Sequence, residues 1–201
     1  MTEVFTTWIV GNKVELSGAL LGILYIFFSI KQHILTWPVG LLTSVLYIIV
    51  FFKSGFYADM GLQFYYVFIS IYGWYYWLKG GDKKEEEDLP VRKITRDVLV
   101  KSTLATVLIY AFILFILIRF TDSTVPFMDS FTTALSIIAT WMLAKKYIEH
   151  WYIWIIVDSV SAGLYVYKNL YPTVILFLIY TVMTIIGYFE WKKDYDKRLQ
   201  I

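Results

Sequence analysis

The chain has no cysteine and few charged residues, and each shortage excludes a class of function. Without cysteine there is no disulfide and no thiolate metal site. Charged residues make up 17% of the 201 positions, whereas an ordinary soluble domain has about a quarter. The net charge is +2, and the basic residues are scattered and form no cluster. We therefore expect no nucleic-acid partner.

Catalytic and phosphate-binding motifs are also missing. The only histidines, His33 and His150, stand at the ends of apolar segments with no partner at metal-ligand spacing, so we expect both on the surface. No glycine-rich phosphate loop is present, and we expect neither ATP-driven pumping nor enzyme activity, metal or cofactor. No basic segment precedes the first apolar run, which is therefore expected to remain as a span and not to be a cleaved signal peptide.

Apolar residues dominate the chain instead. They make up 59% of it, and the mean hydropathy is +0.62. A helix needs about 20 mostly apolar residues to cross a bilayer, and spanning segments must pair their own backbone groups. The sequence therefore predicts an all-α membrane protein with seven transmembrane helices, near 14–30, 34–52, 60–78, 98–120, 131–147, 151–167 and 173–191.

The two ends of the chain match each other at an offset of 114 residues without a gap. The matched pairs are Glu15 with Asp129, Trp37 with Trp151, Tyr57 with Tyr171, Tyr66 with Tyr180, Gly73 with Gly187 and Trp77 with Trp191. Matching at a fixed offset indicates an internal repeat. In transporters built from repeats, the substrate usually binds where two repeats meet.

The repeat predicts a three-plus-one-plus-three organisation. A three-helix repeat ends on the side opposite its start, so a second copy in the same orientation requires one extra crossing. We expect a first repeat over 14–78, a cytoplasmic, solvated linker over 79–97, a connecting helix over 98–120 and a second repeat over 129–191. Parallel repeats of this kind occur in the SWEET sugar transporters, so the predicted fold is SWEET-like.

Basic residues predict the orientation. The seven spans place four Lys and Arg on the side of the amino terminus and fourteen on the other side, which accounts for the total of 18. Cytoplasmic loops are enriched in Lys and Arg. We therefore expect the amino terminus outside and the carboxyl terminus in the cytoplasm.

The sixth span carries polar and aromatic residues on one helical face. Trp151, Trp154, Asp158, Ser161 and Tyr165 follow one another at spacings of three or four, which places them together. A carboxylate in mid-membrane costs about 2.5 to 3.5 kcal/mol on an insertion scale and marks a functional site by default. Beside indoles it suits an organic cation, since a desolvated cation–π contact contributes about 2 kcal/mol.

Two further interpretations of Asp158 stay open. It can bond another helix, with Thr43, Ser44 or Tyr66 as partner, or it can couple transport to a proton. In the third span, Gln63, Tyr66 and Ser70 share a face. The glutamine can form hydrogen bonds with an amide or hydroxyl group of a substrate, or it can form hydrogen bonds that hold two helices together. Thr43 and Ser44 suit helix packing.

Tryptophans near span ends are expected at the membrane interface, where indoles favour headgroup depth. This prediction covers Trp8, Trp37, Trp77 and Trp191.

Three segments resemble the PnuC family of bacterial vitamin transporters: WPVGLLTSVLY, YADMGLQFYYVFISIYGWYYW and EHWYIWIIVDSVSAGLYVYKNLY. The resemblance covers Glu15 to Trp191. It implies a SWEET-like, commonly trimeric carrier in the inner membrane that moves nicotinamide riboside down its gradient, with a cytoplasmic kinase trapping the product. It also implies that Trp151 and Trp154 are the tryptophan pair of the substrate site and that Gln63 is its third-span glutamine.

The chain departs from similar riboside carriers at Thr43, Ser70 and Asp158, where they tend to have asparagine. Thiamine, also a flat cation with a hydroxylated arm, is therefore an alternative substrate, whereas neutral riboflavin fits less well. A membrane scaffold or receptor is a third possibility. The candidate substrate-binding residues are Trp151, Trp154, Asp158, Gln63, Tyr66, Ser70, Thr43, Tyr165 and Tyr180.

Overall fold

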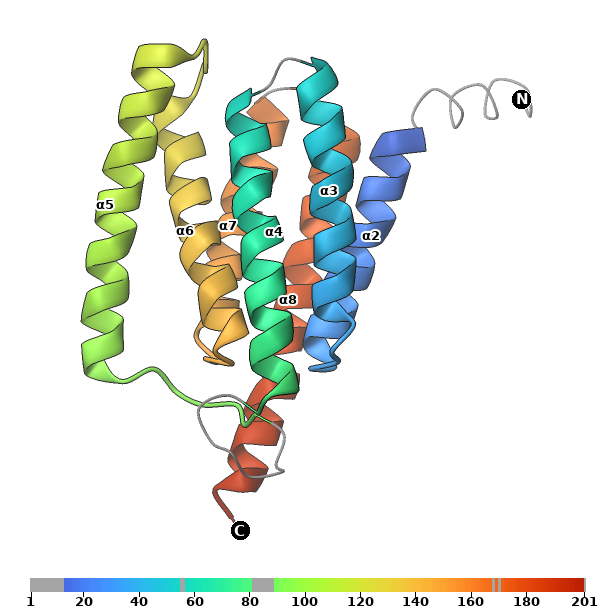
Figure 1. The fold of residues 1–201 in the computed structure, drawn as a ribbon, viewed down its shortest axis with the longest axis vertical. Helices are drawn as coiled ribbons and strands as arrows, with labels where there is room; N and C mark the ends of the chain where they lie inside the picture. Colours follow the sequence, from blue (N-terminus) through green and yellow to red (C-terminus); the bar gives the residue numbers. More distant parts are fainter. Residues whose placement is uncertain (1–12, 55–56, 81–88, 168, 170, 201) are drawn as a thin grey trace. The chain divides into compact units, whose positions relative to one another are not determined.

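A computed structural model describes residues 13–54, 57–80, 89–167, 169 and 171–200 (Figure 1). Within these ranges the chain is all-helical, as predicted, with no strand. The helices are α2 (Lys13–Ile30), α3 (Thr36–Ser54), α4 (Tyr57–Leu78), α5 (Arg96–Phe120), α6 (Pro126–Ala144), α7 (His150–Tyr167) and α8 (Tyr171–Arg198).

Local sequence signals set several helix ends. The hydroxyl of Thr95 accepts a hydrogen bond from the Val98 backbone N–H and caps α5. Pro126 begins α6, at a position where its missing N–H needs no partner. The sequence predicted this helix over 131–147. In the structure α6 begins five residues earlier than that and ends at Ala144. Beyond that end, Lys146 adopts a positive φ of 53°.

The helices belong to two compact units. Unit 1 is Met1–Trp74 and unit 2 is Tyr75–Ile201. In unit 1, α2 packs on α3. In unit 2, α5, α6, α7 and α8 pack in chain order, which Figure 1 shows as a row from yellow-green to red. Ile138, Met142 and Tyr147 form the core of unit 2, and apolar residues of α5 and α7 cover it.

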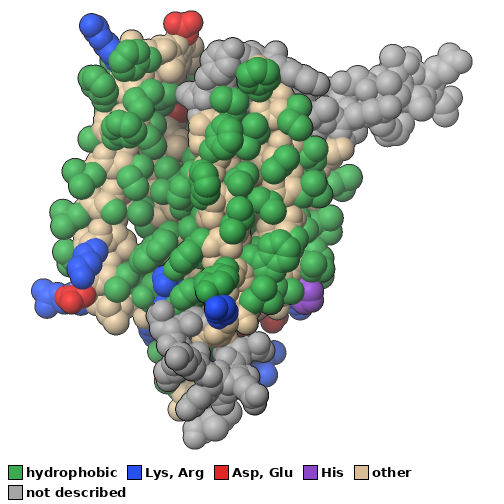
Figure 2. Space-filling view, in the orientation of Figure 1, with side chains coloured by type: hydrophobic (Ala, Val, Ile, Leu, Met, Phe, Trp, Pro, Cys, Tyr) green, Lys and Arg blue, Asp and Glu red, His purple; other side chains and the backbone are tan. Residues whose placement is uncertain are grey.

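The surface of α5 shows that this helix suits lipid. Large hydrophobic side chains along it are exposed, among them Leu104, Leu108, Phe112 and Phe115. Figure 2 shows hydrophobic side chains, in green, along the region of this helix, with charged side chains near its two ends. In the described part of the chain, α5, α6 and α8 are long and apolar enough to cross a membrane.

The turns before α3 and α7 have the same backbone geometry, 114 residues apart. Gln32 and Lys146 both have positive φ, at 52° and 53°. Each turn contains five backbone hydrogen bonds at corresponding positions; for example, His33 N–H bonds to Phe28 at 2.9 Å and Tyr147 N–H bonds to Met142 at 3.0 Å. The two segments therefore fold alike although few of their residues are identical.

Buried tryptophans follow each of these turns. Trp37 is fully buried, and a Cβ on Gly73 would collide with its indole. Trp151 is 2% exposed and has the same relation to Gly187, where a Cβ would lie 2.5 Å from Cη2. The expectation that Trp37, Trp77 and Trp191 lie at the membrane interface was wrong, because all three are buried. Trp8 and the side chains of Glu15 and Tyr57 lie outside the described residues.

The end of the linker differs from the solvated segment that we expected. Leu89 and Val91 are about 5% and 4% exposed, and Arg92 forms a parallel bridge with Tyr147. The charge run over 81–88 lies outside the described residues.

Candidate functional site

Asp158 is the buried carboxylate of α7. Its side chain is 3% exposed, and one oxygen, Oδ2, has no hydrogen-bond partner among the described residues. A buried polar atom without a partner is costly, and such a group is common at functional sites. The described residues therefore leave the hydrogen-bonding capacity of one Asp158 carboxylate oxygen unused.

The hydroxyl of Thr184 on α8 lies within reach of the Asp158 carboxylate. Bonds from Asp158 to Thr43, Ser44 or Tyr66, which belong to the other unit, stay a prediction. Thr184 is 2% exposed, and its hydroxyl also lies 3.0 Å from the carbonyl oxygen of Tyr180 and 2.8 Å from that of Thr181. Since a hydroxyl carries one proton, it donates to only one of these acceptors at a time.

The positions of Asp158 and Thr184 correspond to Ser44 and Ser70 in the 114-residue match. Both serines are 4% exposed, so the same positions are buried in each unit. The hydroxyl of Ser44 donates to its own helix at the Gly40 carbonyl, 2.9 Å away. Unit 2 thus has a carboxylate where unit 1 has a small hydroxyl.

The two tryptophans of α7 have different environments. Trp151 packs against His150 and Trp191, with ring centroids 4.4 and 5.6 Å away. Trp154 is half-buried and lies one helical turn before Asp158. Contact with a ligand is therefore easier for the indole of Trp154, whereas that of Trp151 is enclosed by protein.

Aromatic side chains continue from the carboxylate along α7 and α8. Tyr165 and Phe177 have ring centroids 5.0 Å apart, and Phe177 and Tyr180 are 5.5 Å apart and edge-on. The structure therefore brings the candidates Tyr165 and Tyr180 together. Phe177, which joins them, was missed by the sequence reasoning, although it is the counterpart of Gln63 in the 114-residue match.

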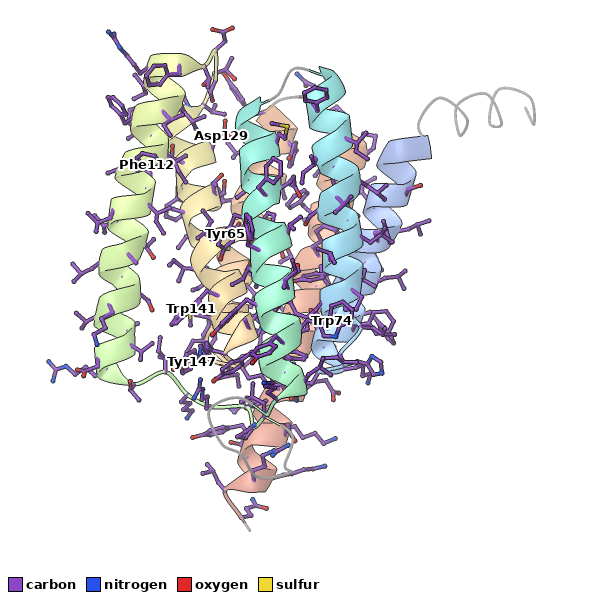
Figure 3. All side chains as sticks on the ribbon, in the orientation of Figure 1. Tyr65, Trp74, Phe112, Asp129, Trp141 and Tyr147 are labelled. Carbon is purple, nitrogen blue, oxygen red and sulfur yellow. The ribbon has the colours of Figure 1, made fainter. Side chains whose placement is uncertain are left out.

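In unit 1 the polar residues of α4 lie near its middle, where Figure 3 labels Tyr65. Gln63 and Tyr66 are half-buried, and the Tyr65 and Tyr66 ring centroids are 5.6 Å apart. Ser70 is buried against α3, since a Cβ on Gly40 would lie 3.2 Å from its Oγ. Thr43 donates to its own helix at the Val39 carbonyl, 2.7 Å away.

His150 contradicts the expectation of a surface histidine, because it is fully buried. Its Nδ1 is 2.7 Å from the Tyr147 carbonyl oxygen, and its ring packs between those of Trp151 and Trp191. Thr36, its counterpart in the 114-residue match, makes the corresponding bond to the His33 carbonyl at 2.8 Å. The 114-residue match, which pairs His150 with Thr36, would have indicated that His150 has a structural role in the turn before α7.

Chemically, the described residues provide binding groups. Within them there is no group of three or more histidine, aspartate or glutamate side chains placed to hold a metal ion. A carboxylate, several phenols and an indole can hold an aromatic cation through charge, hydrogen bonds and ring contacts.

Comparison with known proteins identifies the family. The model of the nicotinamide mononucleotide transporter family matches residues 12–193. The chain belongs to this family. It is also similar to the nicotinamide riboside transporter PnuC of Escherichia coli, with 27% identity over 201 residues, covering 89% of this chain and 84% of that one.

Of two further relatives, one is also named for nicotinamide riboside and the other is named for riboflavin and roseoflavin. The nicotinamide riboside transporter PnuC of Neisseria mucosa is 27% identical, and the match covers 88% of this chain and 70% of that one. The riboflavin/roseoflavin transporter RibM of Streptomyces davaonensis is 24% identical, with 88% and 83% covered. The PnuC family resemblance is thus confirmed.

A solved structure shows the same fold. The crystal structure of the vitamin B3 transporter PnuC superimposes with a TM-score of 0.76 over 97% of this chain and 87% of that one, at 23% identity. Together with the apolar helices, these relatives make the chain a multi-pass membrane protein.

Proposed function

We propose that this protein carries nicotinamide riboside, a cationic vitamin precursor, across the bacterial inner membrane by facilitated diffusion and so feeds NAD biosynthesis. The observation that carries the proposal is the buried Asp158 carboxylate with one unpaired oxygen, one turn from the half-buried indole of Trp154. A carboxylate in a membrane helix is stable only beside a compensating group, and a bound organic cation provides one.

The proposed contacts come from each unit in turn. In unit 2, Trp154 stacks on the aromatic cation and Asp158 balances its charge. Trp151 packs behind this site and supports it. Tyr165 and Tyr180 contribute further aromatic contacts to the substrate. In unit 1, Gln63 and Tyr66 bond the polar substituents, and Ser70 and Thr43 contribute hydroxyl groups. The half-buried side chains of Trp154, Gln63 and Tyr66 support the roles proposed for these three residues.

The transport mechanism that we propose is alternating access by two three-helix repeats of a SWEET-like, three-plus-one-plus-three fold. The equal turns at Gln32 and Lys146 support the repeat, as do the equal Trp37–Gly73 and Trp151–Gly187 contacts. In this proposal α5 is the extra crossing, the amino terminus lies outside and the carboxyl terminus lies in the cytoplasm. A homotrimer and a cytoplasmic kinase that traps the riboside complete it.

Two alternatives share the same site. Thiamine is also a flat cation, and as an alternative substrate it would make the same proposed contacts with Asp158 and Trp154. Proton-coupled uptake uses the same carboxylate as the coupling group. The relatives named above favour the riboside, because two of them are named for it.

Uptake by purified protein in liposomes tests the proposal. Labelled nicotinamide riboside is expected to equilibrate across the membrane, with a rate that does not change when a protonophore dissipates the proton gradient. Accumulation that collapses with the protonophore would instead indicate coupling. An absence of flux for riboside and thiamine alike, with folded and monodisperse protein, would indicate a scaffold or receptor.

A further inference from the structure

The boundary between the two units falls inside a continuous helix. Helix α4 runs over Tyr57–Leu78, yet its residues up to Trp74 group with unit 1 and those from Tyr75 group with unit 2. The last turn of α4 is therefore held by unit 2, and the residues that hold it can be named.

Trp77 joins this turn to the end of α6. Its indole N–H donates to the carbonyl oxygen of Ala144 at 3.0 Å. Ala144 is the last residue of α6, and the final carbonyls of a helix have no partner within the helix. The Nζ of Lys146 lies 4.6 Å from the centroid of the Trp77 ring, which is 9% exposed. The bond therefore pairs the indole N–H of a buried tryptophan with a helix-terminal carbonyl that has no partner within its helix.

Arg92, near the end of the linker, forms hydrogen bonds with both the last turn of α4 and the turn that follows α6. Its backbone N–H donates to Lys146 and its carbonyl accepts from Ile148, both at 3.0 Å. Its Nε donates to the Lys145 carbonyl at 3.0 Å, and its Nη2 donates to the Tyr76 hydroxyl at 3.3 Å. Only the planar guanidinium fork reaches two such acceptors in fixed directions. Arg92 thus ties the last turn of α4 to the turn between α6 and α7.

Cationic side chains lie over the aromatic rings of the same cluster. The Nζ of Lys145 is 3.9 Å from the centroid of the Tyr76 ring, and the Arg92 guanidinium is 4.7 Å from that of Tyr147. Tyr76 and Tyr147 are 7% and 8% exposed. Cation–π attraction is strongest where water is excluded, so these contacts resist separation.

We propose that Tyr76, Trp77, Arg92, Lys145 and Lys146, here called the α4 anchor, stay together throughout the transport cycle. The last turn of α4 then moves with the second repeat, and α4 bends before this turn when the repeats move. The carrier's pivot lies in a helix and not in the linker over 79–97. This inference rests on the proposed function.

The absence of native cysteine makes a direct test possible. Tyr76→Cys and Lys145→Cys are combined and joined with a reducible bis-methanethiosulfonate linker, and uptake of labelled nicotinamide riboside into liposomes is measured before and after linking. The linked protein is expected to transport within about twofold of the unlinked double variant. A tenfold or greater loss that reductant reverses would overturn the proposal. Each single variant, treated with the same reagent, is the control.

Hydrogen exchange tests the anchor without relying on transport. Arg92→Gln and Arg92→Lys both remove the fork, and both are expected to speed exchange of the amides over 75–78 and of the Ile148 amide at least tenfold. Amides over 175–185 in α8 are expected to be unchanged in both. Equal exchange over 75–78 in wild type and both variants would overturn the proposal. If the unmodified chain carries no riboside, the proposed function fails, and these exchange rates still decide whether the anchor exists.

Discussion

The indole of Trp151 occupies the space in which a side chain of residue 187 would lie, and only Gly187 leaves room for it. The same relation joins Trp37 and Gly73, 114 positions earlier in the chain. The Trp37–Gly73 contact packs α3 against α4. The Trp151–Gly187 contact packs α7 against α8 in the same way. In unit 2 that packing holds α7, and therefore Trp154 and Asp158, against α8.

Gly187→Ala is expected to destabilise the protein by about 1–3 kcal/mol, because the added methyl group forces the Trp151 indole out of its position. Thermal unfolding in detergent measures the effect as a lowered midpoint. Gly163→Ala is the matched control, since a Cβ on this α7 glycine meets nothing within 4 Å. Alanine at that position should stabilise slightly through its better helix propensity. Equal midpoints for Gly187→Ala and wild type would contradict the packing described.

Trp154→Ala is expected to weaken nicotinamide riboside binding roughly 30-fold while the fold is kept, because about 2 kcal/mol of cation–π contact is lost. Trp151→Ala should instead lower the unfolding midpoint, since removal of a buried indole costs about 3–5 kcal/mol. Titration calorimetry and thermal unfolding on both variants separate the two roles. Unchanged riboside affinity in Trp154→Ala would exclude the proposed stacking.

Thr184→Val is expected to destabilise the protein by about 1–3 kcal/mol, because it leaves the buried Asp158 carboxylate without its side-chain partner. Thr184→Ser keeps the hydroxyl and should recover most of the loss. When Thr184→Val is combined with Asp158→Asn, the cost should shrink, as expected for two residues in direct contact. Additive effects in this double-mutant cycle, measured by thermal unfolding, would show that the two side chains do not interact.

The seven helices and the 114-residue offset could be predicted because both depend on hydrophobic pattern and identity along the chain. The positions of Trp37, Trp77 and Trp191 could not be, since an indole near a span end suits the membrane interface and the protein core equally. Gly73 and Gly187 stood in the same self-match as Trp37 and Trp151. Pairing them as partners requires the distance between helices, which the sequence does not contain.

The candidate site was predicted in part. Asp158 was singled out by its charge within an apolar segment, and the structure shows that it is buried. Its role in substrate binding stays a prediction. Its partner Thr184 lies 26 residues away on another helix, and no sequence period links the two. Arg92 was missed for a similar reason. It follows a charge run that favours a solvated linker, whereas its side chain bonds to Tyr76 on α4 and to the Lys145 carbonyl, 53 residues further along the chain.

Calorimetric titration of wild type and Asp158→Asn with nicotinamide riboside, and with its neutral dihydro form, tests the central claim most directly. The carboxylate should favour the cation in the wild type. In Asp158→Asn, the affinity for the cation should fall about 30-fold or more, and that for the neutral form should change little. Equal affinity of both proteins for the cation would contradict the account.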